Sequence, residues 1–300
     1  VVMGIGLLNK HSTLLFGAAV AAAVVASPLR RELRKPWIWL GAAIAVAIFA
    51  PNLVWQAAHG FPTLEDLRNV RESGKNVVLA PLPFLLQQVL MVHPILAPVW
   101  VAGLVHLLAG TGRRFRPLGI VFVVLFGAFL ALHGKDYYLA PAYPIPLAAG
   151  AVAIERWTAR RRSAAVARRL RAATAAAIVA AGAVTAPLAL PVLSPEHYVA
   201  YRSALGVEPS KTEVAHEGPL PQLWGDQFGW PELVAEVARI YHALPETERA
   251  RACVFAGNYG EAGAINLFGS RYGLPRANRT VLRHLGAGVR DAEVLYAGLP

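Results

Sequence analysis

Cysteine is almost absent from this sequence. Its 300 residues include one cysteine, Cys253, and two methionines. A single cysteine cannot form a disulfide bond within the chain, and it cannot supply the paired thiolates of a structural zinc site. The sequence therefore predicts no disulfide framework and no cysteine-based metal site, and we expect no cofactor and no metal.

Charged residues are also scarce, and acidic residues are the scarcest in the first two thirds. Only 16% of the chain is charged, 56% is hydrophobic, and the mean hydropathy is +0.44, whereas soluble proteins carry about 25% charged residues. Residues 1–193 hold 6 acidic and 19 basic residues, and residues 194–300 hold 12 acidic and 10 basic residues. We predict a transmembrane domain over residues 1–193 and a soluble domain over residues 194–300.

Fourteen of the 19 basic residues in the first part fall into three short clusters between apolar runs. Basic connections of this kind are typical of the cytoplasmic side of membrane proteins. They are not interleaved with aromatic residues, so we predict no nucleic-acid partner despite the high net charge. The clusters are Arg30, Arg31, Arg34 and Lys35; Arg113, Arg114 and Arg116; and Arg156, Arg160, Arg161, Arg162, Arg168, Arg169 and Arg171.

The apolar runs predict about six membrane spans. A helix needs about 20 mostly apolar residues to cross a bilayer, and we assign spans to residues 13–26, 37–55, 81–108, 118–132, 141–154 and 172–193. With six spans, each basic cluster lies on the cytoplasmic side, and residues 56–80, 133–143 and 194–300 lie on the opposite side. The expected fold is a mainly α, polytopic helical membrane bundle with a small extracytoplasmic α/β domain at the C-terminus.

Two polar stretches outside the spans have their own patterns. Phe61, Leu64, Leu67 and Val70 recur every third residue, which predicts an amphipathic helix in the membrane interface or, alternatively, a solvated surface helix. In the tail we expect a helix over residues 231–244, strands over residues 252–256 and 293–297, and a glycine turn whose Asn258 caps a helix. Asn278 matches the N-glycosylation pattern, which we attribute to chance.

The segment 133–146 is the most polar island inside the apolar part. A lysine, an acid and three tyrosines here separate two predicted spans. Charges placed at membrane depth usually mark a site, so we expect a short aqueous loop with a binding role. The alternative is that Lys135 and Asp136 pair locally while Tyr137, Tyr138 and Tyr143 form an interfacial aromatic belt. Lys10 is a second isolated cation, either a substrate contact or a snorkelling turn residue.

Six segments, taken in order, resemble a known family. They read GLLNKHS at residues 6–12, PNLVWQ at 51–56, HGFP at 59–62, GKDYYLAPAYP at 134–144, DQFGW at 226–230 and AGNYGEAGAI at 256–265. In this order and spacing the chain resembles bacterial integral-membrane glycosyltransferases of the family 39 type. That group includes protein mannosyltransferases and the aminoarabinose transferase that modifies lipid A.

The resemblance implies a GT-C fold in the bacterial inner membrane. It implies transfer of a sugar from a polyprenyl-phosphate carrier to a lipid, glycan or protein acceptor on the extracytoplasmic face. It also implies that the family's catalytic acid lies in an earlier outward loop, so we expect the base upstream of residue 1 and expect the chain alone to be inactive. The residues to which we assign contacts with the lipid phosphate or the substrate are Lys135, Tyr137, Tyr138, Tyr143 and Lys10.

Two other classes stay open at this point. Proline-broken spans with polar residues inside them are also typical of transporters, although the two halves show no inverted repeat. A membrane scaffold without catalytic activity, whose outer domain binds a partner, is the third class.

Overall fold

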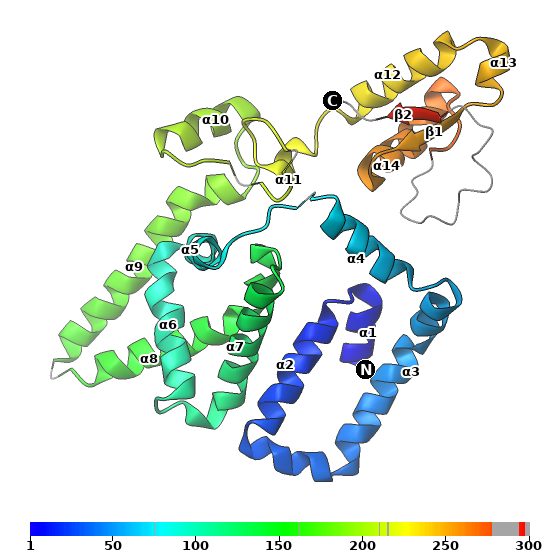
Figure 1. Ribbon diagram of the computed structural model, residues 1–300. Coiled ribbons are helices and arrows are strands. Elements are labelled where there is room, and N and C mark those ends of the chain that lie inside the picture. The colour runs from blue at the N-terminus through cyan, green and yellow to red at the C-terminus, as the bar shows by residue number, and fades with distance from the viewer. Residues whose placement is uncertain (75, 162, 210, 215, 278–293, 298–300) are drawn as a thin grey trace. The chain divides into compact units, whose positions relative to one another are not determined.

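The structure is a computed structural model that describes residues 1–74, 76–161, 163–209, 211–214, 216–277 and 294–297 (Figure 1). These residues are mainly helical, with one two-stranded sheet among them. The prediction of a mainly α, polytopic helical bundle is confirmed. The chain forms two compact units, Val1–Ala58 with Val77–Ser194, and His59–Asn76 with Pro195–Pro300. The predicted boundary between residues 193 and 194 stays a prediction.

The first unit is built from helices joined by short turns (Figure 1). Its elements are α1 (Val2–Asn9), α2 (Thr13–Val25), η1 (Pro28–Arg34), α3 (Pro36–Ala58), α5 (Pro81–Val92), η2 (Pro94–Leu96), α6 (Ala97–Leu108), η3 (Arg113–Phe115), α7 (Arg116–Ala131), η4 (Asp136–Ala142), α8 (Pro144–Ala159) and α9 (Ala164–Ala189).

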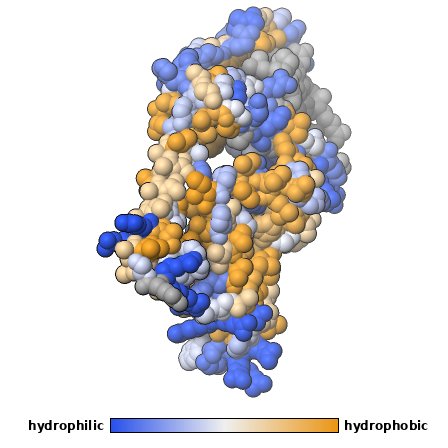
Figure 2. All heavy atoms as spheres, turned by 90° about the vertical axis from the view of Figure 1, so that its left-hand side faces the viewer, coloured by the Kyte–Doolittle hydropathy of each residue, from blue (hydrophilic) through white to orange (hydrophobic). Residues whose placement is uncertain are grey.

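Membrane spans are supported by length, composition and surface. Among the described residues, three helices (Pro36–Ala58, Arg113–Ala131 and Ala164–Ala189) are each long and apolar enough to cross a bilayer, and six spans result if each bent helix pair counts as one. Large apolar side chains are widely exposed, for example Trp37 at 72% and Trp39 at 63%. Figure 2 shows hydrophobic residues on the side of the first unit that carries α9. Such a surface needs a partner, and lipid provides it.

Two of the predicted spans differ from the structure. Residues 81–108 do not form one kinked helix, because α5 and α6 are bent by 96° at the break. His93 takes a positive φ of 85° there, and its Nδ1 accepts a hydrogen bond from the Ile95 N–H. The last helix of the first unit, α9, begins at Ala164 and not near residue 172, because the alanines between the arginines favour a continuous helix.

The core of the first unit lies between α2, α5, α7 and η4. Its fully buried side chains include Phe84, Phe122 and Leu139. Beside it, α6 and α8 cross with almost no side chain between their backbones. A Cβ added at Gly103 would collide with the carbonyl oxygen of Pro146, and a Cβ at Gly150 would collide with that of Val99. Small residues at such crossings are typical of membrane helices.

The second unit contains a small α/β fold. Its elements are α4 (Pro62–Glu72), α10 (Pro195–Ala204), α11 (Gln222–Gly225), α12 (Trp230–Ala243), α13 (Glu246–Arg249), β1 (Cys253–Ala256), α14 (Tyr259–Phe268), η5 (Gly269–Tyr272) and β2 (Val294–Ala297). The strands pair in parallel, with Cys253 opposite Val294.

The helices and strands that the sequence predicts in this unit are present in the structure. The amphipathic pattern near residue 61 forms α4, the tail helix forms α12, and the two strands form β1 and β2. Val234, Val254 and Ile265 bury their side chains between α12, β1 and α14. The interfacial position of α4 stays a prediction, and Asn278 lies outside the described residues.

Candidate functional site

The polar island begins where α7 ends. The N–H of Gly134 donates to the carbonyl of Phe129 at 2.8 Å, and the N–H of His133 donates to that of Leu130. His133 has a positive φ of 53°. This is the Schellman arrangement, in which a residue in the left-handed region closes the last turn of a helix. The Gly134 backbone lies so near Phe129 that an added Cβ would be 2.7 Å from Cδ1 of its ring. The chain therefore leaves α7 in a fixed direction.

The island is a tight helical turn with one buried and one exposed face. After Lys135 the chain forms η4 and continues directly into α8. Leu139, Ala142 and Tyr143 are buried, since the turn packs its apolar side chains onto α5 and α7. The prediction of a solvated loop over residues 133–143 is thus wrong for the inner face of the turn. Its outer face keeps Tyr137 exposed and Lys135 half-buried.

A buried amide fastens this turn to α5. Gln88 is 1% exposed, and its Nε2 donates to the carbonyl of Asp136 at 3.1 Å. The hydroxyl of Tyr143, a residue that is 3% exposed, donates to Oε1 of Gln88 at 3.1 Å. The Tyr143 ring lies edge-on to Trp100 and Phe122. A buried amide is unfavourable unless it is hydrogen-bonded, and both ends of Gln88 are bonded here. Sequence reasoning did not identify Gln88.

Two lysines and two tyrosines meet on the outer face of the turn; we call them the lysine–tyrosine cluster (Lys10, Lys135, Tyr137 and Tyr138). Nζ of Lys10 lies 4.6 Å from the ring centroid of Tyr138, and Nζ of Lys135 lies 5.9 Å from that of Tyr137. The two rings are edge-to-face at 4.9 Å. The structure thus brings together four of the five predicted site residues, with Lys10 contributed by a turn 125 residues before Lys135.

The charges of the two lysines are not neutralised by acids nearby. Within the part of the chain that the structure describes, no carboxylate oxygen lies within 4 Å of Nζ of either lysine. The alternative expectation of a local Lys135–Asp136 ion pair is therefore wrong. Oδ1 of Asp136 instead accepts the N–H of Tyr137 at 2.9 Å, because a short carboxylate can hydrogen-bond a neighbouring backbone N–H. The cluster presents two cations beside two aromatic faces.

Tyr143 is placed differently from the other predicted site residues. Its side chain points into the core and its hydroxyl is already bonded to Gln88. In this arrangement Tyr143 holds the turn in position, whereas Tyr137 and Tyr138 lie beside the cations. Its direct contact with a substrate stays a prediction.

The Lys10 turn is itself held by two contacts. Oγ1 of Thr13 donates to the carbonyl of Gly6 at 3.0 Å, which closes the turn between α1 and α2. The ring of His11 lies 3.3 Å from Oδ1 of Asn52 on α3 and edge-on to Phe49. The segments 6–12 and 51–56, which carry part of the family resemblance, are therefore in contact with each other beside the cluster.

The glycine turn of the tail is a capped helix start. Oδ1 of Asn258 accepts the N–H of Glu261 at 3.0 Å, and Oε2 of Glu261 accepts the N–H of Gly257 at 2.8 Å. This pattern resembles a capping box, except that the carboxylate bonds the N–H one residue before the N-cap. The prediction of Asn258 as a helix cap is confirmed. Because the Glu261 carboxylate already occupies this N-terminus, the turn is unsuited to a phosphate.

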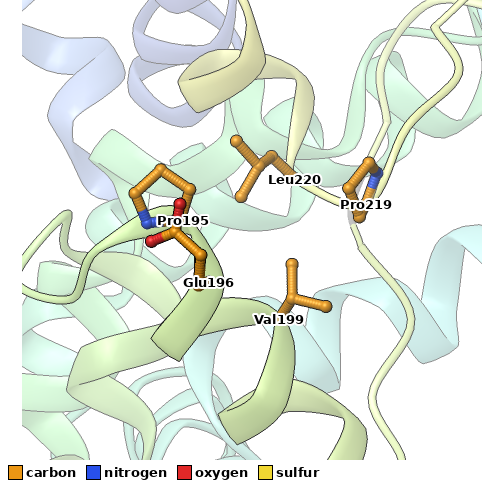
Figure 3. Close-up of a pocket in the computed structure, with 5 residues that line it drawn as sticks. All are labelled: Pro195, Glu196, Val199, Pro219 and Leu220. Carbon is orange, nitrogen blue, oxygen red and sulfur yellow. The ribbon is translucent and has the colours of Figure 1, made fainter.

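The second unit contains a surface hollow. The side chains of Pro195, Glu196, Val199, Pro219 and Leu220 line it, and Figure 3 shows them around one space beside α10. Glu196 is the one ionisable side chain among these five, so the hollow lacks the paired groups of acid–base or nucleophilic catalysis. Among the described residues there is also no group of three or more histidine, cysteine or acidic side chains that could hold a metal ion.

Comparison with known proteins supports one class. The family model described as dolichyl-phosphate-mannose-protein mannosyltransferase matches residues 1–55. The matched segment contains Lys10, His11 and Asn52, and so covers the N-terminal part of the site. The match supports a membrane glycosyltransferase of the GT-C type. The curated proteins and the solved structures contain no match to the chain.

Proposed function

We propose that this chain is the part of a membrane glycosyltransferase that holds the phosphate of a polyprenyl-phosphate sugar donor. The observation that carries the proposal is the lysine–tyrosine cluster, in which two cations lie at a helical turn with no carboxylate within 4 Å among the described residues. The family match over residues 1–55 supports the same chemistry.

The cluster suits the leaving group of such a transfer. When the bond from the sugar to the phosphate oxygen breaks, negative charge develops on the lipid phosphate. Cations positioned in advance stabilise that charge more in the transition state than in the ground state. Lys135 and Lys10 provide the charge, and the hydroxyls or ring faces of Tyr137 and Tyr138 contact the phosphate or the sugar. The Asp136 carboxylate accepts the N–H of Tyr137, so we assign the cluster to the leaving group and not to base catalysis.

The donor side of the reaction faces away from the cytoplasm in this proposal. The basic connections near residues 30–35, 113–116 and 156–171 favour the cytoplasmic face, which leaves the cluster at the outer face of a bacterial inner membrane. The acceptor is then a lipid, glycan or protein of the cell envelope. The tail unit lies on the same side.

Sugar transfer in membrane vesicles tests the proposal. Vesicles that contain the natural protein are supplied with a polyprenyl phosphate carrying a radiolabelled sugar, and the label in the acceptor fraction is measured. We expect Lys135→Ala to lower the rate by about a hundredfold, as for loss of one group that stabilises developing charge. Lys35→Ala is the matched control, since Lys35 is exposed and pairs with Glu32 at 2.7 Å. Equal rates for Lys135→Ala and Lys35→Ala at equal expression would contradict the proposal.

A transporter is the second candidate, because of the break between α5 and α6. Helices interrupted at mid-span, as at His93, often form solute sites in transporters. The same vesicles distinguish the two functions. Uptake of a labelled solute without any transfer of label from the lipid donor would favour a transporter.

A further inference from the structure

The junction of α8 and α9 forms a basic hollow that the proposed sugar transfer does not use. The hollow measures about 820 Å³, which is within the size range of small-ligand sites. Three arginines and five alanines line it: Arg161, Arg168, Arg171, Ala159, Ala164, Ala167, Ala172 and Ala175. The hollow therefore has positively charged side chains next to small apolar ones.

Two of the arginines are fixed by contacts that leave their charge available. Nε of Arg171 donates to Oγ1 of Thr158 at 2.8 Å, and Thr158 is fully buried. A guanidinium carries five N–H donors, so this bond uses one of them. The guanidinium carbon of Arg161 lies 4.1 Å from the ring centroid of Trp157. A stacked arginine keeps its in-plane donors for an anion.

No acid offsets these charges locally. Among the residues that the structure describes, no carboxylate oxygen lies within 4 Å of a guanidinium nitrogen of Arg161, Arg168 or Arg171. All three arginines are solvent-exposed, so their donors are open to water or to a bound anion. Arginine binds phosphate oxygens through pairs of parallel hydrogen bonds.

The surroundings place this hollow at a membrane face. Trp157 is 52% exposed beside it, and tryptophan is enriched at membrane–water interfaces. Four of the five alanines lie along the start of α9, a helix that is long and apolar enough to cross a bilayer. Their small side chains leave room for an acyl chain beside the helix. A free phosphate ion would bind to the arginines alone and would make no use of the apolar alanine surface.

We propose that the hollow binds an anionic phospholipid, with its phosphate on Arg161, Arg168 and Arg171 and an acyl chain along the alanines of α9. Basic pockets beside membrane helices on the cytoplasmic side bind such headgroups, and the positive connection between α8 and α9 favours that side. This lipid belongs to the cytoplasmic leaflet, whereas the proposed sugar donor belongs to the outer leaflet. The two sites are therefore independent.

Lipid titration followed by native mass spectrometry tests the proposal. The protein in detergent is titrated with phosphatidylglycerol, and separately with phosphatidylcholine of the same acyl chains. We expect one phosphatidylglycerol to bind at least about tenfold more tightly than phosphatidylcholine, given the attraction of anionic lipid to each arginine. Arg161→Gln with Arg168→Gln should remove this preference, and this pair leaves the Arg171–Thr158 bond intact. The matched control is Arg30→Gln with Arg34→Gln, which removes the same charge from η1 and should keep the preference.

Three results would overturn the proposal. Equal binding of both lipids to the unmodified protein would show that the headgroup charge is not recognised. An equal loss in the two double variants would show a general effect of surface charge. Displacement of phosphatidylglycerol by millimolar inorganic phosphate would show that free phosphate, and not a lipid, is the ligand.

Discussion

Tyr143 donates a hydrogen bond to Gln88 across 55 residues of sequence, with 3.1 Å between the hydroxyl oxygen and Oε1. The other end of the same amide donates to the carbonyl of Asp136. Gln88 therefore joins α5 to both ends of η4, which contains Tyr137 and Tyr138 and directly follows Lys135. The position of the proposed phosphate site depends on a small polar network inside an apolar core.

Removing the Tyr143 hydroxyl should weaken the attachment of η4 to α5. Tyr143→Phe leaves Oε1 of Gln88 buried without its donor, which costs about 1–3 kcal/mol. We expect the free energy of unfolding, measured by titration with sodium dodecyl sulfate in mixed micelles, to fall by that amount. Gln87→Leu is the matched control, because Gln87 is the adjacent amide on α5 and is only half-buried.

The double variant tests whether the network acts as a unit. Gln88→Leu with Tyr143→Phe removes both partners, so its loss of stability should be smaller than the sum of the two single losses. Additive losses would contradict the hydrogen bond as the source of the effect.

The crossing of α6 and α8 should not tolerate a methyl group. Gly103→Ala places a Cβ against the carbonyl of Pro146 and 2.7 Å from the Gly150 nitrogen, so the helices must move apart. We expect a loss of about 1–3 kcal/mol in the same unfolding measurement. Gly127→Ala on α7 is the control, since a Cβ there would have no atom within 4 Å. If Gly103→Ala were as stable as Gly127→Ala, the close approach of the two helices would be wrong.

The exposed pair on α12 gives a pH prediction. The side chain of Arg239 donates to Glu236 and adds its positive charge, and this lowers the pKa of Glu236 below its ordinary value. A lowered carboxyl pKa means that the pair stabilises the folded state above the ordinary pKa of glutamate, near 4.3, and that this contribution is lost as the pH falls through the lowered pKa. The pKa of Glu236 is measured by following its carboxyl carbon signal with pH in a nuclear magnetic resonance titration. Arg239→Met should raise this pKa to the ordinary value, and an unchanged pKa would exclude the pairing.

Much of the fold could be predicted from the sequence because its signals are local. A long apolar run is sufficient for α3, and the period of three in Phe61, Leu64 and Leu67 is sufficient for α4. The 96° break at His93 could not be predicted, because prolines in an apolar run are compatible with a kinked helix as well as with two separate ones. Gln88 was missed because one amide in an apolar run has no periodic pattern.

The site could be predicted only as a set of residue types. Lys135, Tyr137 and Tyr138 are neighbours in the sequence, and their polarity between two spans identified them. The contact of Lys10 with the Tyr138 ring joins residues 128 positions apart, and only the packing of α2 on α7 brings them together. The inward position of Tyr143 likewise depends on Gln88, Trp100 and Phe122.

The affinity of the protein for a fluorescent polyprenyl phosphate in detergent tests the central claim most directly. We expect Lys10→Gln with Lys135→Gln to weaken binding by at least about tenfold, because each lost cation removes a charge-assisted contact with the phosphate. Lys35→Gln with Lys211→Gln removes the same charge elsewhere and should leave the affinity within about twofold, as expected for exposed charges. Equal affinities of the two double variants would contradict the assignment of the lysine–tyrosine cluster as the lipid-phosphate site.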